Sequence, residues 1–260
     1  MQALPKLNAV EFRKVLGTGT TKPCVFQCED SSGKPAGEYA TKLRGGVRSN
    51  EIGLQYEFIA WHLAAYFNVP HLPTGLITIE EELTSTIQDG EVREHVKRSI
   101  GLNFGTEFRA GFNTWVAGDT IPPSLQNTAA EIVAFDAVIE NVDRKRDKPN
   151  LLFKGDELLV LDHELAFSFI QTVGLDLNNW NSKRLEFLSH HPFQRGLKRK
   201  ALDLTDFASQ LGKLSNKTIT GICDAVPPEF GAVDAKIPAH LKAVRENATT
   251  VMDIIREIFK

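Results

Sequence analysis

The first half of the chain contains short apolar runs whose connections are too short to hold a crossover helix. Three such runs, at 10–16, 24–30 and 38–45, are separated by stretches rich in glycine, proline and small polar residues at 17–23 and 31–37. Parallel neighbours need a crossover of a dozen or more residues, whereas antiparallel neighbours need only a turn. We therefore expect these runs to form an antiparallel meander.

Helical periodicity replaces this pattern once in the first half and through most of the second half. At 50–68, Leu54, Phe58, Trp61 and Ala65 recur every three to four positions, which is typical of one face of a helix. Further strands are expected at 76–83, 150–155 and 157–162, and further helices at 122–141, 203–214 and 237–259. Strands and helices are thus segregated along the chain, which favours the α+β class.

The segregation also indicates two lobes. The stretch at 105–123 is rich in glycine and proline and lies between the β-rich part and the helical part. We therefore place a β-rich N-lobe with one long helix at 1–118 and a mostly helical C-lobe at 119–260. A chain of 260 residues is long enough to bury a core of this size.

Composition excludes several classes of protein. A net charge of −3 gives no sign of a general nucleic-acid binder, and no apolar run approaches the roughly 20 residues that span a bilayer. The first twelve residues lack the basic and apolar segments of a signal peptide. Three cysteines do not suggest a disulfide framework. We expect a cytoplasmic protein that binds neither membrane nor nucleic acid directly.

Residues 141–167 are the most informative stretch for function. Asp143 and Asn150 lie in a polar loop, two short apolar runs follow, and the second run ends at Asp162. A hairpin formed by the two runs returns Asp162 to the neighbourhood of Asn150. Carboxylate and amide oxygens are hard ligands of the kind that Mg²⁺ accepts, so this stretch predicts a metal and phosphate site.

The first half supplies the other groups that a phosphoryl-transfer site needs. Glycines let backbone N–H groups face an anion, and the candidate phosphate loop contains Gly17, Gly19, Thr20 and Thr21. Lys42, on the third expected strand, is the candidate cation for the phosphates. Glu57 lies among apolar residues of the long helix, where a carboxylate needs a partner, so we pair it with Lys42. Glu51 is the rival, but an acid in the first turn simply suits the helix dipole.

Each of these residues also has an ordinary structural explanation. The glycines suit a hairpin turn, Lys42 suits an exposed strand position, and Asp143, Asn150 and Asp162 suit turns and strand ends. The functional interpretation depends on their joint occurrence in one order along the chain.

The histidines near this stretch carry a weaker signal. His163 follows Asp162 on the opposite side of an extended backbone, and either a catalytic role or a structural hydrogen bond explains it. Glu164 shares the direction of Asp162 and could reach the metal. His190 and His191 lie in a polar stretch without nearby cysteines or acid clusters, so we expect them at the surface.

The quoted residues resemble those of HipA-like kinases, a group with the protein-kinase fold that is related to phosphoinositide kinases. The resemblance rests on "FDAVIENVDRKRDKPNLLF" and "LLVLDHELAF", with "YATKLRGG", "QYEFIAWHLAAYFNVPHLPTGLITIE" and "GLNFGTEF" before them in the same order. It extends from Leu16 to Phe167, and the last ninety or so residues match only as a generic helical lobe.

The resemblance implies a role for each candidate. Asp143 would be the catalytic aspartate, and Lys42, also catalytic, would contact the ATP phosphates with Glu57 orienting it. Asn150 and Asp162 would bind Mg²⁺. Residues near 101–108 would form the hinge behind adenine.

One departure from the group is the length of the loop from Asp143 to Asn150. Asn150 lies seven positions after Asp143, whereas many relatives have a shorter loop. The additional length carries Arg144, Lys145, Arg146 and Lys148. These charges either assist the transferring phosphate or belong to a longer solvated connection.

The resulting functional hypothesis is an ATP- and Mg²⁺-dependent kinase that transfers the γ-phosphate to a hydroxyl, foremost a serine or threonine of a protein, itself included. A nucleotide-binding pseudokinase or regulatory module is one alternative, and the complete set of candidate residues argues against it. A small-molecule or lipid kinase is another, and the negative net charge argues mildly against a lipid substrate.

Overall fold

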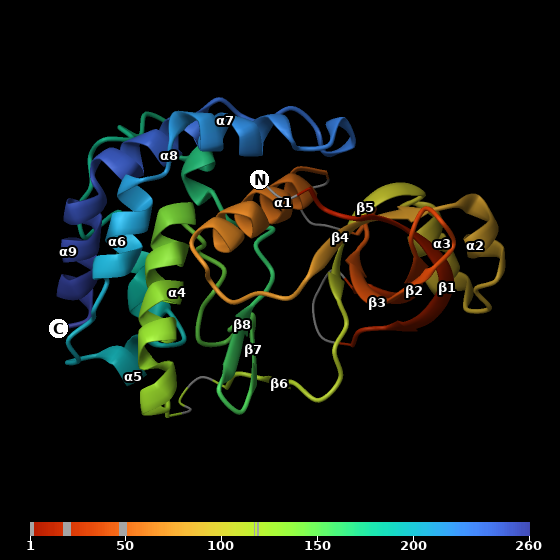
Figure 1. The fold of residues 1–260 in the computed structure, drawn as a ribbon, viewed down its shortest axis with the longest axis horizontal. Helices are drawn as coiled ribbons and strands as arrows, with labels where there is room; N and C mark the ends of the chain where they lie inside the picture. Colours follow the sequence, from red (N-terminus) through yellow and green to blue (C-terminus); the bar gives the residue numbers. More distant parts are fainter. Residues whose placement is uncertain (1–2, 18–21, 47–50, 117, 119) are drawn as a thin grey trace.

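A barrel of strands and a body of helices lie at opposite ends of the molecule, and helix α1 (Glu51–Tyr66) lies between them (Figure 1). The computed structural model describes residues 3–17, 22–46, 51–116, 118 and 120–260. The mixture of strands and helices confirms the α+β expectation. We call residues 123–260 the helical region.

The barrel is closed, which the expected meander did not anticipate. Strands β1, β2 and β3 pair antiparallel as expected, and β5 pairs antiparallel with both β3 and β4. Closure comes from a parallel pair, in which Lys6 of β1 is opposite Leu76 of β4. The strands are β1 Lys6–Val15, β2 Cys24–Glu29, β3 Pro35–Lys42, β4 Thr74–Ile79 and β5 Gly101–Glu107. The interior of the barrel is closely packed at Gly105, where a Cβ would lie only 2.5 Å from Ile77 Cγ1, so a larger residue would not fit without a shift.

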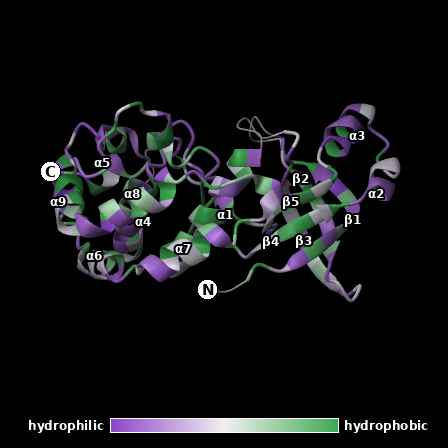
Figure 2. Ribbon diagram, turned by 90° about the horizontal axis from the view of Figure 1, so that it is seen from above, coloured by the Kyte–Doolittle hydropathy of each residue, from purple (hydrophilic) through white to green (hydrophobic). Residues whose placement is uncertain are grey.

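The barrel has a hydrophobic core of its own. Its strands carry hydrophobic and hydrophilic residues side by side (Figure 2), and the buried ones include Phe26, Tyr39 and Ile77. Two helices, α2 (Glu81–Ser85) and α3 (Gly90–Lys97), add side chains to this core, among them Leu83 and Val96. The expected strand at 76–83 is therefore wrong beyond Ile79, where the chain turns into α2.

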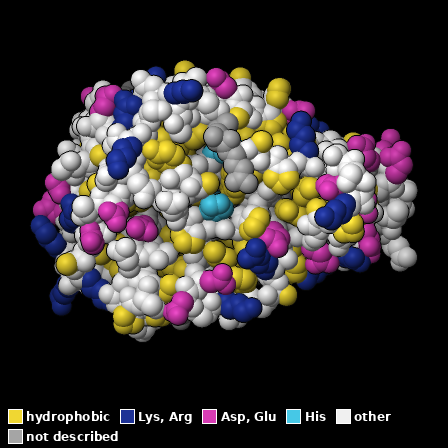
Figure 3. Space-filling model, in the orientation of Figure 1, with side chains coloured by type: hydrophobic (Ala, Val, Ile, Leu, Met, Phe, Trp, Pro, Cys, Tyr) yellow, Lys and Arg dark blue, Asp and Glu magenta, His cyan; other side chains and the backbone are white. Residues whose placement is uncertain are grey.

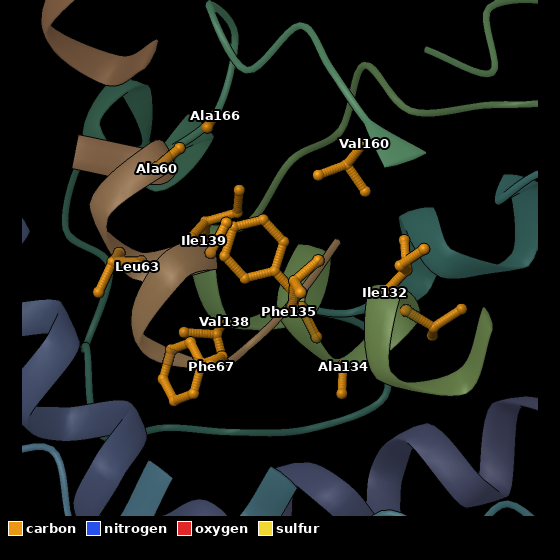
Figure 4. Packing of buried hydrophobic residues seen from close by; sticks show 14 of the residues in the cluster. Ala60, Leu63, Phe67, Ile132, Ala134, Phe135, Val138, Ile139, Val160 and Ala166 are labelled. Atoms are coloured by element: carbon orange, nitrogen blue, oxygen red, sulfur yellow. The ribbon is translucent and has the colours of Figure 1, made fainter. Parts of the chain in front are cut away.

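Helix α1 belongs to the main core rather than to the barrel core. Its residues Ala60 and Leu63 lie with Phe135 and Val138 of α4 (Gln126–Ile139) in one buried cluster (Figure 4). The expected apolar stripe is only partly right, since Ala65 is exposed. Most sides of the helix are covered because it is enclosed between the barrel and the helical region.

The helical region is interrupted by one small sheet. The sheet contains β7 Leu151–Lys154 and β8 Glu157–Val160 of this region, and β6 Asn113–Thr114, which precedes the region in the chain, pairs with β7. The other helices are α5 Gln194–Leu197, α6 Thr205–Gly212, α7 Asn216–Asp224, α8 Lys236–Glu246 and α9 Ala248–Ile258, with 3₁₀ turns at Pro123–Leu125, Ser168–Gln171, Glu186–His190 and Pro228–Phe230. The single helix expected at 237–259 is two helices, because Asn247 leaves the helical conformation and its side-chain amide donates to the Ala243 carbonyl at 2.8 Å.

The surface is mixed in charge. Lysine, arginine, aspartate and glutamate side chains alternate with hydrophobic patches on the face shown in Figure 3. Within the described part of the chain, no helix combines the length and the apolar character that crossing a membrane requires.

Candidate active site

A buried lysine joins the barrel to helix α1. Lys42 Nζ lies 2.5 Å from Glu57 Oε1, and the side chain of Glu57 is only 5% exposed. This confirms the expected pairing, whereas the rival Glu51 is exposed at the start of the helix. Alternation along β3 explains the placement: Tyr39 and Thr41 are buried toward the barrel interior, so Lys42 faces out toward α1.

Asp162 approaches the same lysine from the helical region. Its Oδ1 lies 2.5 Å from Lys42 Nζ, and its Oδ2 lies 3.3 Å from Lys148 Nζ. Asp162 follows β8 with a left-handed backbone (φ 59°), a conformation that Asp tolerates better than most residues. Burial opposes its negative charge, but the ammonium groups of Lys42 and Lys148 outweigh burial and lower the pKa of the carboxyl.

The loop from Asp143 to Asn150 brings these two residues close together despite its length. We call it the catalytic loop, after the role that is expected of Asp143. Lys145 and Lys148 form an isolated antiparallel bridge, with N–H to carbonyl distances of 3.1 and 3.0 Å. The turn between them absorbs the additional residues. Asn150 Nδ2 then lies 3.5 Å from Asp143 Oδ2, and Lys148 Nζ lies 2.5 Å from the same oxygen.

Arg144 neither faces the phosphate site nor lies in solvent, which were the two possibilities left open for the basic residues of the loop. It is 1% exposed, and its Nε lies 2.6 Å from Asp136 Oδ2 on α4. Its guanidinium also donates to the carbonyls of Asn150 and Leu161, which lie before β7 and after β8. Arg144 thus ties the catalytic loop to both strands of the hairpin. Burial opposes ionisation of Asp136, but Arg144 and His191 outweigh it and lower the pKa of the carboxyl.

Two other basic residues of the loop also lie away from the cluster. Arg146 Nη2 donates to the Ser189 carbonyl and to Gln194 Oε1, at 2.9 and 3.0 Å. Lys145 is exposed, and its amine lies 3.9 Å from Asp147. Of the four basic residues in the loop, Lys148 is the one whose charged group contacts the carboxylates of the candidate site, those of Asp143 and Asp162.

His191 is buried, which corrects the expectation that the histidine pair lies at the surface. Its side chain is 1% exposed, and its Nε2 lies 3.1 Å from Asp136 Oδ2. Only His190 is exposed. The partner of His191 is 55 positions earlier in the chain, so the local sequence contains no sign of the contact.

His163 has structural partners on both sides. Its backbone N–H donates to Glu57 Oε1 at 2.7 Å, and its Nδ1 lies 3.5 Å from Glu57 Oε2. Its Nε2 lies 3.0 Å from Arg144 Nη2. A guanidinium can only donate, so Nε2 accepts and the ring proton is on Nδ1, facing Glu57. These contacts favour the structural explanation of His163 over the catalytic one.

The candidate phosphate loop is described only in part. Gly17 follows β1, its backbone is not left-handed, and the space where a Cβ would be is open. Gly19, Thr20 and Thr21 lie outside the described residues. The range 101–108, expected as a hinge, is mostly β5, where Phe104 is opposite Lys42, so the connecting segment begins only at Phe108.

The donor set suits a hard divalent cation. Asp162 supplies a carboxylate, and Asn150 supplies an amide oxygen next to Asp143. Among the described residues, no group of three His, Cys, Asp or Glu side chains is arranged around a common metal position. Mg²⁺ ordinarily keeps several waters and takes few protein ligands, so a site of this size fits it better than it fits Zn²⁺.

Sequence reasoning missed the distinction among the basic residues of the loop. Lys148 precedes Pro149 and Asn150, and the proximity to Asn150 was the one local sign that it lies nearer the site than Lys145. Arg144 follows Asp143 directly, and its burial depends on Asp136, which lies on α4 among buried apolar residues.

Comparison with known proteins gives one family. The HipA-like kinase family model matches residues 9–257, which is wider than the segment from Leu16 to Phe167 that carried the resemblance. Among solved structures, the proinflammatory kinase CtkA of Helicobacter pylori is similar at 11% identity with a TM-score of 0.48, and 95% of each chain is covered. The search of curated proteins found no match. The family match includes every residue of the cluster around Lys42.

Proposed function

The chain belongs to the HipA-like kinase family, and from this premise we propose that it transfers the γ-phosphate of ATP, with Mg²⁺, to the hydroxyl of a protein serine or threonine, its own included. The observation that carries the proposal is the convergence of Lys42, Glu57, Asp143 and Asp162 in one connected cluster. These residues come from a barrel strand, helix α1, the catalytic loop and the segment that follows β8.

Lys42 is the group that binds and orients the phosphates in this proposal. A fixed ammonium between the barrel and the catalytic loop pairs with phosphate oxygens and places the γ-phosphate. Burial opposes its charge, but Asp162, Glu57 and Glu164 outweigh burial and raise its pKa, which keeps the amine protonated. Glu57 holds it in place and is itself held by the backbone N–H of His163.

Asn150 and Asp162 are the residues that would hold Mg²⁺. When bound, the ion supplies positive charge that offsets the charge of the phosphates and of the transferring group. Both residues have left-handed backbones, with φ of 50° and 59°, and both lie next to Asp143 or its partner Lys148.

Asp143 is the group that would orient the acceptor hydroxyl and accept its proton. One of its oxygens, Oδ2, is held by Lys148 at 2.5 Å and by Asn150 at 3.5 Å. A carboxylate fixed in this way can accept a hydrogen bond from an alcohol with little reorganisation. Lys148 lies between Asp143 and Asp162, where its charge would face the transferring phosphate.

The proposal includes the two-lobed division. We assign residues 1–118 to an N-lobe that contains the barrel and α1, and 119–260 to a C-lobe that contains the catalytic loop. The cluster around Lys42 joins residues from both parts, which is where a nucleotide would need to bind to contact Lys42 and Asp162 together.

The test of the proposal is Asp143→Asn with γ-labelled ATP and Mg²⁺. We expect phosphoryl transfer to fall by about a hundredfold or more, while ATP affinity stays within a few-fold, because a proton acceptor acts mainly in the transition state. Asp147→Asn is the matched control, since Asp147 lies in the same loop with its side chain 78% exposed. Turnover in Asp143→Asn equal to that of the control would refute the assignment.

The acceptor class is tested with the same label. The purified protein alone reports transfer to itself, and a lysate separated into protein, lipid and small-molecule fractions reports the other classes. Label in protein that yields phosphoserine or phosphothreonine supports the proposal. Label found only in lipid or small molecules would replace the acceptor while leaving the kinase assignment in place.

A further inference from the structure

Glu164 is a buried carboxylate whose interactions are incomplete. Its side chain is 1% exposed, and its Oε2 has no hydrogen-bond partner. Lys42 Nζ lies 3.6 Å from this oxygen, which is too far for a hydrogen bond. A buried carboxylate oxygen without a donor is costly, so its presence here needs an explanation.

The charges in the cluster around Lys42 do not balance. Glu57, Asp162 and Glu164 surround Lys42, and Asp143 and Asp162 contact Lys148. Four carboxylates therefore face two ammonium groups, which leaves two negative charges in a largely buried space. His163 does not offset them, because its Nε2 accepts a hydrogen bond from Arg144.

The contact with Lys42 alone does not explain why the carboxylate of Glu164 is buried. The amine already has Glu57 and Asp162 at 2.5 Å each, and these two contacts are geometrically better than the one to Glu164. A third carboxylate at this position repels Glu57 and Asp162, while the lysine that could offset this repulsion is already paired with both.

We propose that Glu164 belongs to the divalent-cation site, where it provides a third protein oxygen donor beside Asn150 and Asp162. The inference rests on the proposed function, because it concerns the metal of that same site. Glu164 lies two residues after Asp162, and the two acids contact Lys42 together. A divalent cation would balance the two excess charges and provide a partner for the free carboxylate oxygen.

The experiment measures binding of Mn²⁺, as a paramagnetic substitute for Mg²⁺, by electron paramagnetic resonance without nucleotide. We expect Glu164→Gln to weaken Mn²⁺ affinity by about tenfold or more, comparable with the loss of a metal-site partner. Glu157→Gln is the control, since Glu157 is an exposed glutamate on β8 a few residues earlier. Equal Mn²⁺ affinities in Glu164→Gln and the control would overturn the inference.

Thermal unfolding gives a second readout that does not depend on activity. Without metal, Glu164→Gln should melt at or above the wild-type temperature, because it removes one of the repelling charges. The rise in melting temperature on adding Mn²⁺ should be smaller than in the wild type, since stabilisation follows affinity. A full wild-type rise in the variant would contradict the inference.

The outcomes distinguish a failure of the Glu164 inference from a failure of the proposed metal site. Failure of the proposed metal site appears in the wild type, which would then bind no Mn²⁺, whereas failure of the inference appears as normal binding in Glu164→Gln. If Glu164 serves only Lys42, metal-free ATP affinity falls and Mn²⁺ affinity does not, which also overturns the inference. Glu164→Asp keeps the negative charge and should bind Mn²⁺ more tightly than Glu164→Gln does. This second variant keeps the inference testable if the glutamine variant folds poorly.

Discussion

Lys148 is the residue whose role changes most when the side chains are seen in place. Within the catalytic loop it contacts both Asp143 and Asp162, at 2.5 and 3.3 Å. Burial opposes its charge, but Asp162 and Asp143 outweigh burial and raise the pKa of the amine. The ammonium is therefore charged and held between the proposed proton acceptor and the proposed metal ligand.

We predict that Lys148→Gln lowers kcat on the order of a hundredfold, as the loss of one preorganised donor to a transferring group does. The Kd of ATP should change only a few-fold, because Lys42 remains. Single-turnover kinetics with labelled ATP would measure both quantities.

Lys145→Gln is the control for this prediction, because Lys145 lies in the same turn and is exposed. It should behave like the parent protein. If the two variants are equally active, Lys148 is only a structural partner of the carboxylates, and the charge of the loop has no part in transfer.

Residues whose partners are implied by chemistry were predictable, and residues whose partners are distant were not. Glu57 lies in an apolar stretch and needs a cation, which predicted its pairing with Lys42, the candidate cation of the third expected strand. Arg144, by contrast, appeared equivalent to its three basic neighbours in the loop. Its burial depends on Asp136 and His191, and no local pattern places these three side chains together.

At the scale of elements, helix α1 is fixed to the helical region by its side chains. Gln55 is 1% exposed, and its Nε2 donates to the carbonyls of Phe230 and Gly231 at 3.2 and 3.1 Å. Near the end of the helix, Tyr66 donates to the Gln210 carbonyl at 3.3 Å. These contacts hold the helix that positions Glu57.

We predict that Gln55→Leu lowers the free energy of unfolding by about 1–3 kcal/mol, because the buried Phe230 carbonyl and the neighbouring Gly231 carbonyl lose their donor. It should also raise the Kd of ATP several-fold, since α1 then places Glu57 less firmly against Lys42. Urea unfolding and calorimetry would measure the two effects.

Ile52→Gln provides the comparison on the same helix, because Ile52 is 48% exposed. It should leave both quantities near the parent values. If the Gln55→Leu protein loses stability but binds ATP like Ile52→Gln, the hydrogen bonds of Gln55 stabilise the fold and do not support the site.

Elements with strong local patterns were predicted well, and those that depend on tertiary contacts were not. The three strands of the first half, α1 and α4 appear where their periodicity indicated. The parallel pair of β1 with β4 joins residues about 70 positions apart, and no pattern in either strand signals it. The break at Asn247 was missed because apolar periodicity continues on both sides of it.

At the scale of the whole molecule, the buried histidine His240 makes stability depend on pH. Its Nε2 donates to the Val138 carbonyl at 2.7 Å, and its Nδ1 accepts from Arg184 at 3.1 Å. Burial lowers its pKa from 6.5 to about 3, with Arg184 acting in the same direction and the Val138 carbonyl opposing. The folded state therefore favours neutral His240. Its contribution is fully present above pH 6.5 and is lost as pH falls toward 3.

We predict that the free energy of unfolding falls by about 1.4 kcal/mol between pH 7.5 and 5.5 because of His240 alone. His240→Gln should be less stable at pH 7.5, since it loses stacking on Phe169, but it should show a smaller fall over this range. Urea unfolding at both pH values would measure the difference.

His190→Gln is the control, because His190 is exposed and should leave the pH dependence unchanged. If His240→Gln shows the same fall as His190→Gln, the acid sensitivity of the fold arises elsewhere.

The order of elements predicted the class of the whole molecule, but not its division into cores. Segregated strands and helices gave α+β, and the structure agrees. The sequence placed the long helix with the strands because the two are neighbours in the chain. In the structure the buried face of α1 shares a core with α4, since a barrel closed on itself fills its own interior.

The separate core of the barrel has a consequence for the rate at which a nucleotide would leave. Lys42 is carried by a barrel strand, whereas Glu57 and Asp162 are carried by elements of the main core. Rotation of the barrel as a rigid body would therefore stretch the contacts of Lys42, and it would also shift Leu76 and Phe104, the barrel-strand residues that pack in the main core. Motions of this kind occur in microseconds to milliseconds. The lifetime of the bound nucleotide would then be set by how often these two ion pairs break together, and not by the affinity of any single contact.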